Sequence, residues 1–173
     1  RPRNVLTSIY LDPKQEETVN LRLMKKWQEI EKNEVRYKEY FMEDAQFAVI
    51  GFGSAGRVAL SAVRAARAEG IRVGLFRPIS LSPFPKKRIY ELSQKLQGFF
   101  VVEMNSGMML DDVLLASQGN IPVEFYGRMG GVMPFPDEIL CEIRFLHNHE
   151  WKKDGHPRDR WLAKIETIMK EEQ

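Results

Sequence analysis

The sequence predicts a three-layer α/β/α fold in which a mostly parallel sheet lies between two layers of helices. Short apolar runs alternate with longer amphipathic segments from residue 47 to residue 145. The apolar runs are nearly continuous, which is typical of strands covered on both faces. The first run leads into the turn Gly51-x-Gly53-x-x-Gly56, which opens an Ala- and Val-rich helix. Right-handed crossovers between the parallel strands follow by default.

The N-terminal part of the chain is expected to lie outside this sheet. Residues 1–16 are interpreted as an extended arm that turns at Asp12-Pro13. A helix is predicted from Thr18 to about residue 34, with Thr18 as its N-cap, because apolar residues recur there at helical spacing. These residues, which we interpret as a packing face, are Leu21, Met24, Trp27 and Ile30.

The remaining elements follow the alternation along the chain. A short first strand over residues 37–41 is placed beside the Gly51 strand, with an antiparallel direction left open. Further strands are expected over residues 47–50, 71–76, 99–103 and 123–126, and helices over residues 54–69, 85–96, 107–116 and 137–145. The segment from Arg144 onward is charged. It is expected to end in an amphipathic helix whose apolar face carries Trp161, Leu162, Ile165, Ile168 and Met169.

Composition narrows the class of protein. Hydrophobic residues make up 43% and charged residues 29% of the chain, as in ordinary globular proteins. The net charge of +2 gives no reason to expect nucleic acid or a membrane as a partner. The single cysteine, Cys141, excludes an internal disulfide, a cysteine-rich zinc site and an iron–sulfur cluster held by this chain alone.

The sequence also leads to expectations about the cellular location of the protein and about whether the chain is a fragment. No apolar run approaches 18 residues and no signal peptide is recognisable, so a cytoplasmic protein is expected. The chain opens on Arg1 rather than Met, and its first segment lacks a core of its own. We therefore expect a fragment of a longer protein.

The glycine turn has the spacing of a dinucleotide-binding fingerprint. In such a fold the second strand ends in an acid that binds the ribose, but here it ends in Arg77-Pro78, and Glu69 comes before that strand. We therefore interpret Gly51, Gly53 and Gly56 as a structural turn that lets strand and helix pack closely. An autonomous nucleotide- or anion-binding domain that uses this turn remains the alternative.

The loops at the carboxyl ends of the strands are the expected functional surface, as in other open parallel sheets. The third and fourth of these loops are rich in methionine and carry no convergent charges, which favours contact with a protein over binding of a charged ligand. Asn105 and Arg128 are expected to add directional hydrogen bonds to such a contact. The predicted interface residues are Met104, Asn105, Met108, Arg128, Met133 and Phe135.

Residues suited to catalysis are few. Ser54 lies between strand and helix, but its neighbours do not form the Gly-x-Ser-x-Gly elbow of hydrolases. Glu103, at a strand end, is expected to accept hydrogen bonds from loop amides rather than to act as a catalytic acid. The three histidines all lie near the C-terminus and are interpreted as solvated rather than metal-binding: His147, His149 and His156.

Several motifs in one order carry a family resemblance. They are Gly51-Phe-Gly-Ser, Gly74-Leu-Phe-Arg-Pro-Ile-Ser-Leu-x-Pro-Phe-Pro85, Val101-Val-Glu-Met-Asn-x-Gly107 and Val123-Glu-Phe-Tyr-Gly-Arg-x-Gly-Gly131. Together they resemble pyruvate:ferredoxin oxidoreductase core domain II, the C-terminal, transketolase-C-like part of the thiamine-binding subunit in 2-oxoacid:ferredoxin oxidoreductases. The earlier motifs Ser8-x-Tyr10-Leu-Asp-Pro13 and Glu34-x-Arg36-Tyr37 resemble the 2-oxoisovalerate branch. The resemblance covers residues 1–143.

The resemblance implies a five-stranded mixed sheet with an antiparallel first strand, similar to the transketolase C-terminal domain. Residues 35–145 would form this domain, after an arm and linker helix at residues 1–34. Residues 146–173 would be a charged tail with an amphipathic helix.

The resemblance also implies a structural and assembly role in a holoenzyme that converts a branched-chain 2-oxoacid to acyl-CoA. Thiamine diphosphate and Mg²⁺ would be held by the preceding domain and by a diphosphate-binding subunit, whose Gly-Asp-Gly…Asn motif this chain lacks. Iron–sulfur clusters would sit on a ferredoxin-like subunit, with CoA as co-substrate. We therefore expect no catalytic, cofactor-binding or metal-binding residue in this chain, an inactive isolated fragment, and an oligomeric complex with the other subunits.

Overall fold

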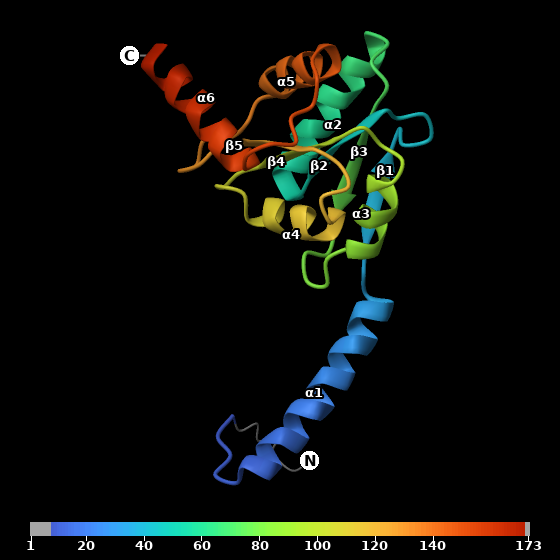
Figure 1. Cartoon of the computed structure of the whole chain (residues 1–173), viewed down its shortest axis with the longest axis vertical. Coiled ribbons are helices and arrows are strands. Elements are labelled where there is room, and N and C mark those ends of the chain that lie inside the picture. The colour runs from blue at the N-terminus through green and yellow to red at the C-terminus, as the bar shows by residue number, and fades with distance from the viewer. Residues whose placement is uncertain (1–7, 172–173) are drawn as a thin grey trace.

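The computed structural model describes residues 8–171 and shows a five-stranded mixed sheet with helices on both faces (Figure 1). The strands lie in the order β1-β3-β2-β4-β5. Their bounds are Tyr37–Tyr40 for β1, Phe47–Gly51 for β2, Val73–Pro78 for β3, Phe99–Glu103 for β4 and Val123–Gly127 for β5. Strands β2 to β5 are parallel, and β1 is antiparallel, with Tyr37 opposite Pro78. The predicted mixed sheet is confirmed.

The predicted neighbour of β1 was wrong, because β1 pairs with β3 and not with the Gly51 strand. Every residue of β2 is buried, and β3 and β4 occupy its two edges. The sequence of β1, Tyr-Lys-Glu-Tyr, leaves its first half exposed and suits an outer position in the sheet. Both edges of β2 are occupied by other strands, whereas the outer edge of β3 is free to pair with β1.

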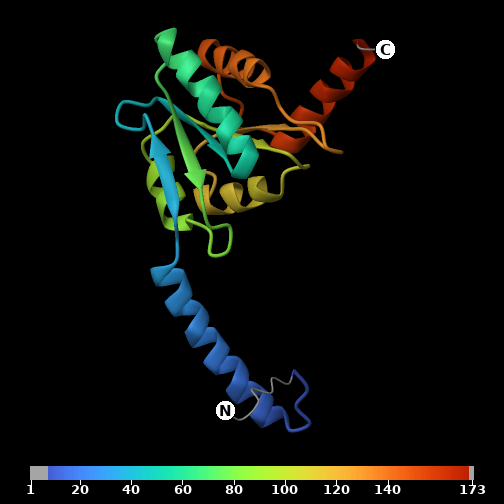
Figure 2. The same cartoon turned by 180° about the vertical axis from the view of Figure 1, so that it is seen from behind.

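Two helices cover each face of the sheet (Figures 1 and 2). On one face lie α2, Gly53–Ala68, and α5, Pro136–Asn148; on the other lie α3, Lys86–Ser93, and α4, Met108–Ser117. The core between them is rich in aromatic and branched side chains. Its largest fully buried members include Phe47, Phe76, Phe99, Phe100 and Ile50. The predicted three-layer arrangement is therefore confirmed, although α3 ends three residues earlier than expected.

Helix α1, Pro13–Asn33, begins earlier than predicted. Asp12 is its N-cap and accepts a hydrogen bond from the backbone nitrogen of Lys14 at 3.1 Å, and Pro13 takes the first helical position. Thr18 lies inside the helix and donates its hydroxyl to the Lys14 carbonyl. The extended arm was therefore wrong for residues 13–16, whereas residues 1–7 lie outside the described part.

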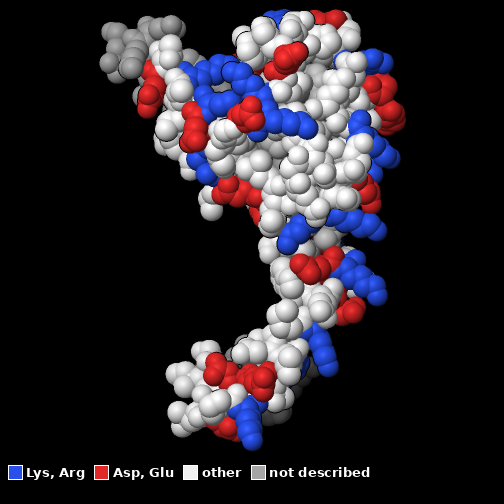
Figure 3. Space-filling model, in the orientation of Figure 1, with Lys and Arg blue, Asp and Glu red and all other residues white. Residues whose placement is uncertain are grey.

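Helix α1 extends away from the domain (Figures 1 and 3). None of its residues is buried. Of the predicted packing face, Leu21, Met24 and Trp27 are exposed and Ile30 is half-buried. Within residues 8–171 the exposed part of this face therefore has no packing partner. None of the helices in the same range is long and apolar enough to cross a membrane.

The C-terminal helix α6, Pro157–Glu171, packs on β5. Trp161 is only 4% exposed, donates its indole N–H to the Gly127 carbonyl at 2.9 Å and meets the Phe125 ring edge-on. Ile165, one turn further along, is buried as well, but Leu162 of the predicted apolar face is exposed. The predicted division into an arm and linker helix, a central domain and a C-terminal tail remains a proposal. The helix of the predicted tail contacts the sheet of the central domain.

Candidate interface at the carboxyl edge of the sheet

The parallel strands all end at one edge of the sheet, here called the carboxyl edge. The loops after β2, β4 and β5 meet there, and so do the first turns of α2, α4 and α5. Because β1 is antiparallel, it starts at this edge, opposite Pro78, and α1 therefore approaches the domain from the same side. All the residues predicted from the sequence to be functional lie in these loops or first turns.

The glycine turn after β2 brings strand and helix into close contact. A Cβ on Gly56 would lie 2.5 Å from the carbonyl oxygen of Gly51, a distance that no side chain accommodates. Gly53 has open space around its missing Cβ but a φ of +56°, in the left-handed region. Gly56 is therefore required for space and Gly53 for its backbone conformation, a geometry that favours a structural role for the turn.

The acids that a ribose would need lie elsewhere. Arg77 stands at the end of β3, where a dinucleotide fold places its acid, and its Cγ would lie 3.3 Å from a Cβ on Gly56. Glu69 caps the far end of α2, at the opposite edge of the sheet, and pairs with Arg144 at 2.6 Å. Neither residue provides an acceptor beside the turn.

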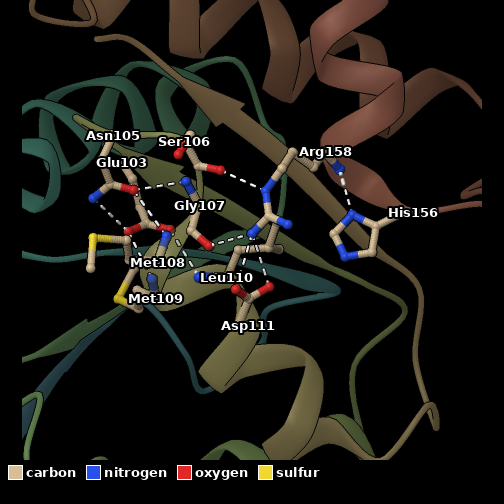
Figure 4. Close-up of polar contacts among 10 residues, drawn as sticks. All are labelled: Glu103, Asn105, Ser106, Gly107, Met108, Met109, Leu110, Asp111, His156 and Arg158. Atoms are coloured by element: carbon tan, nitrogen blue, oxygen red, sulfur yellow. Dashed lines mark hydrogen bonds and ion pairs between the residues drawn. The ribbon is translucent and has the colours of Figure 1, made fainter. Parts of the chain in front are cut away.

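Glu103 ends β4 and organises the loop that follows (Figure 4). Its side chain is 5% exposed and accepts hydrogen bonds from the backbone nitrogens of Met109 and Leu110, both at 2.9 Å. These amides belong to the first turn of α4, where a negative charge is favourable. The predicted role of Glu103 as an acceptor of backbone amides is confirmed, although these amides belong to the first turn of α4 and not to the loop.

Asn105 holds the same loop from within. Its Oδ1 accepts from the nitrogens of Gly107 and Met108 at 2.7 and 2.9 Å, and its Nδ2 donates to Glu103 at 3.0 Å. The side-chain amide of Asn105, which was predicted to bind a partner, therefore makes these hydrogen bonds inside the domain. What the loop turns outward is the side chain of Met108, which is 74% exposed, and that of Met104.

The loop after β5 has the same organisation. Arg128 is turned inward: its side chain is 16% exposed, forms an ion pair with Glu138 at 3.2 Å and has a buried Nε without a partner. Burial and the nearby Glu138 raise the pKa of the Tyr126 hydroxyl well above its ordinary value. Met133 and Phe135 of this loop are exposed, Phe135 by 64%.

The polar groups of these loops thus point inward and the apolar groups point outward. Sequence reasoning missed one member, Phe52, the central residue of Gly51-Phe-Gly53, which is exposed at the same edge. It lines a shallow hollow together with Met104 and Asn105. A signal was available in the sequence, because Phe52 lies between Gly51 and Gly53, directly after the predicted strand and in the turn at its carboxyl end. The carboxyl-edge surface consists of Phe52, Met104, Met108, Met133 and Phe135.

A second feature that the sequence did not reveal is the contact between α6 and the β4–α4 loop (Figure 4). Arg158 donates to the carbonyls of Ser106 and Gly107 and to the carboxylate of Asp111. His156 accepts from the Arg158 backbone nitrogen through Nδ1, at 3.1 Å, just before the helix begins. Of the two other histidines, both exposed, His149 stacks on Phe145.

The residues present do not fit the cofactors that the family resemblance implies. Within residues 8–171, no group of three or more His, Cys, Asp or Glu side chains could hold a metal ion. Cys141 is exposed, and one thiolate cannot hold an iron–sulfur cluster. The buried carboxylate of Glu103 is engaged with two amides of α4 and with the Asn105 side chain. That this chain binds no cofactor remains a prediction.

Comparison with known proteins gives a family match to part of the chain. Residues 45–139 match the model of pyruvate:ferredoxin oxidoreductase core domain II. The chain is 48% identical over 142 residues to the ketoisovalerate oxidoreductase subunit VorB of Methanothermobacter marburgensis, covering 82% of the chain and 40% of the relative. It is 38% identical over 101 residues to the 2-oxoglutarate synthase subunit KorA of the same organism, covering 58% and 27%. The chain thus spans about 40% of the length of its VorB relatives.

Solved structures agree on the fold. A 2-oxoglutarate:ferredoxin oxidoreductase from Magnetococcus marinus matches with a TM-score of 0.66 at 19% identity, over 80% of this chain and 24% of that one. An inactive β4 tetramer of a split-gene transketolase matches with a TM-score of 0.55 at 18% identity, over 64% and 40%. The fold is therefore the transketolase-like α/β fold expected from the sequence. With its matched motifs and its sheet order, the chain belongs to the pyruvate:ferredoxin oxidoreductase core domain II family.

Proposed function

We propose that this chain is the domain II part of a 2-oxoacid:ferredoxin oxidoreductase subunit that acts on a branched-chain 2-oxoacid. The observation that carries the proposal is its similarity to a ketoisovalerate oxidoreductase subunit, which is closer and longer than its similarity to a 2-oxoglutarate synthase subunit. The holoenzyme would decarboxylate its substrate oxidatively and transfer the acyl group to CoA. Thiamine diphosphate with Mg²⁺ would supply the decarboxylation chemistry, and iron–sulfur clusters would carry the electrons.

Within that enzyme, the role proposed for this chain is structural. Glu103, the one buried acid among residues 8–167, caps α4, and the inward-facing Arg128 is paired with Glu138. Neither side chain is available to a substrate at the carboxyl edge. The domain therefore contributes shape and contact surface to the assembly rather than a reacting group.

The carboxyl-edge surface is the proposed contact with the other subunits. Exposed methionines and phenylalanines gather where open sheets bind their ligands, and the charges beside them are neutralised inside the domain. Flexible, polarizable Met side chains adapt to a partner's surface and gain free energy when water is removed from them. Met104, Met108, Met133 and Phe135 would make the contacts, while Asn105 and Arg128 would hold the two loops that carry them.

The alternative, an autonomous nucleotide- or anion-binding domain, has less support. The spacing of the three glycines is the one observation that favours this alternative. The contact between Gly56 and Gly51 explains that spacing by packing, and Arg77 occupies the position of the ribose-binding acid.

A substrate assay on the assembled enzyme tests the proposal. The subunit that carries this chain would be co-expressed with its partner subunits, and viologen reduction would be followed with thiamine diphosphate, Mg²⁺ and CoA. We expect a higher kcat/KM with 2-oxoisovalerate than with 2-oxoglutarate. A preference for 2-oxoglutarate would contradict the branched-chain assignment, and no turnover of any 2-oxoacid would contradict the proposed enzyme class.

A further inference from the structure

We infer that α6 holds the β4–α4 loop in place through the contacts of Arg158 with Ser106, Gly107 and Asp111, here called the clasp. Arg158 is then the positioning residue that keeps Met104 and Met108 facing outward. Arg158 lies 19 residues beyond the last residue of the family match, which ends at position 139, so the clasp is added to the matched domain. The inference rests on the interface proposed above, because positioning these methionines matters only if a partner binds them.

The contacts of Arg158 join segments that are about 50 residues apart in the chain. Its Nε donates to the Ser106 carbonyl at 2.7 Å, and its Nη2 donates to the Gly107 carbonyl at 2.8 Å. The same Nη2 meets the Asp111 carboxylate at 2.9 and 3.1 Å. One guanidinium thus binds two successive loop carbonyls and the first turn of α4 (Figure 4).

These bonds complete the support of the loop. The backbone amides of residues 107–110 donate to the side chains of Asn105 and Glu103. The N–H groups of this segment are therefore bound by residues of the domain itself. The carbonyls of Ser106 and Gly107 face α6 and are held by Arg158. With both sides bound, the backbone of the loop is held in the conformation from which Met108 projects into solvent.

Gly107 is suited to this arrangement in two ways. Its φ is +100°, which favours glycine, and a Cβ there would lie 3.3 Å from both Nε and Nη2 of Arg158. The missing side chain therefore leaves room for the guanidinium to approach the backbone. A lysine could not replace Arg158, because a single ammonium lacks the planar fork with which the guanidinium donates to two carbonyls at once.

Helix α6 has anchors that do not involve the loop. Arg160 donates to the Val123 carbonyl at 2.8 Å and to the carboxylate of Glu124 at 3.1 Å. Trp161 binds the Gly127 carbonyl. The helix should therefore stay on β5 when Arg158 is replaced, so that loss of the clasp can be separated from loss of the helix.

Amide hydrogen exchange on the whole chain tests the clasp. In R158Q we expect the amides of Gly107 and Met108 to exchange roughly tenfold faster, since charge-assisted bonds to the loop are lost. R158K should resemble R158Q, because it keeps the charge but not the fork. K164Q, which removes a cation that pairs with Glu142 on α5, is the matched control and should exchange like the parent.

Methyl signals of Met104 and Met108, labelled with ¹³C, give a second readout: they should shift and broaden in R158Q and remain unchanged in K164Q. Parental exchange at Gly107 and Met108 in R158Q, or equal increases in R158Q and K164Q, would overturn the clasp. If R158Q lowers the stability of the whole domain, R158K takes its place, and parental exchange there overturns the clasp as well.

Binding of the partner subunits distinguishes the clasp from the proposed interface. If both are right, R158Q weakens assembly as well as loosening the loop. If loop amides exchange faster in R158Q but assembly is complete, the positioning role is overturned and the result counts against the interface, while the contact between Arg158 and the loop stands. If loop amides exchange in R158Q as slowly as in the parent, the clasp is overturned whatever the assembly result.

Discussion

The Oε1 atom of Glu103 lies 2.9 Å from the backbone nitrogen of Leu110, seven residues further along the chain. The carboxylate is buried at the carboxyl end of β4, in a position where α/β enzymes often place a reacting group. Here it satisfies amides at the start of α4, which have no partner within the helix. The most conspicuous acid of the edge therefore maintains the shape of the loop.

Replacing Glu103 should destabilise the domain. In E103Q, one amide of α4 would face an NH₂ group and the charge at the helix N-terminus would be lost, so we expect a loss of about 2 kcal/mol of unfolding free energy. Urea unfolding measures it. E91Q, at a more exposed ion pair with Arg88, is the control and should change stability by less than about 0.5 kcal/mol. A similarly small effect of E103Q would refute the capping role.

The glycine turn should respond differently at its two positions. In G56A the new methyl group would meet the Gly51 carbonyl at 2.5 Å, so we expect a loss above about 2 kcal/mol. G53A meets no atom and should lose about 1 kcal/mol through its left-handed backbone, and G53N should lose less, since Asn tolerates that conformation. Thermal and urea unfolding give the ranking. Equal stability of G56A and parent would refute the packing explanation.

Tyr126 should make the stability of the domain fall in alkali. Its folded-state pKa is raised above the ordinary value of 10.0, chiefly by burial, so the unfolded chain loses its proton first. Stability present below pH 10 is therefore lost as the pH rises above it, by up to about 1.4 kcal/mol per pH unit. Y126F should show a shallower decline between pH 10 and 11 than the parent. Y90F, at an exposed tyrosine, should follow the parent, and identical slopes for Y126F and parent would contradict the prediction.

Much of the fold could be predicted from the sequence because its signals are local. The strands β2, β4 and β5 are short apolar runs bounded by turns, and the helices between them show clear periodicity. The start of α1 was misplaced because Asp12-Pro13 is both a turn signal and a helix-start signal. The place of β1 could not be derived, since strand order depends on which edge the other strands leave free.

The candidate site likewise has features that could be predicted from the sequence and features that could not. The methionines of the two loops are visible in the sequence, and their exposure follows from the inward turn of Glu103 and Arg128. The partner of Arg158 is not visible, because its contacts lie about 50 residues away and are made to backbone carbonyls, which have no sequence signature. Arg128 was expected to reach outward, and only the position of Glu138 in the first turn of α5 reveals its internal partner.

The isolated chain should be inactive and should bind no cofactor tightly. It lacks the diphosphate-binding motif, and its described residues provide no metal-binding cluster. We expect no viologen reduction with 2-oxoisovalerate, thiamine diphosphate, Mg²⁺ and CoA. Calorimetric titration with NAD⁺, NADP⁺, thiamine diphosphate or CoA should give no dissociation constant below the millimolar range. Tight binding of a dinucleotide that G53A abolishes would favour the alternative function instead.

The central claim is that the carboxyl-edge surface holds this domain to its partner subunits, and charge introduced there tests it most directly. The double variant M108D/M133D would be made in the subunit that carries this chain, co-expressed with the other subunits and purified through a partner's tag. Its control, L115D/F145D, places the same charges on exposed apolar residues near the carboxyl ends of α4 and α5, at the opposite edge.

Buried anchors at protein interfaces often contribute more than about 1 kcal/mol each, and a buried, unpaired carboxylate adds a desolvation penalty. We therefore predict that M108D/M133D melts within a few degrees of the parent as an isolated chain but no longer co-purifies with the partner subunits, whereas L115D/F145D still does. Normal co-purification and full 2-oxoacid oxidation by M108D/M133D would contradict the account.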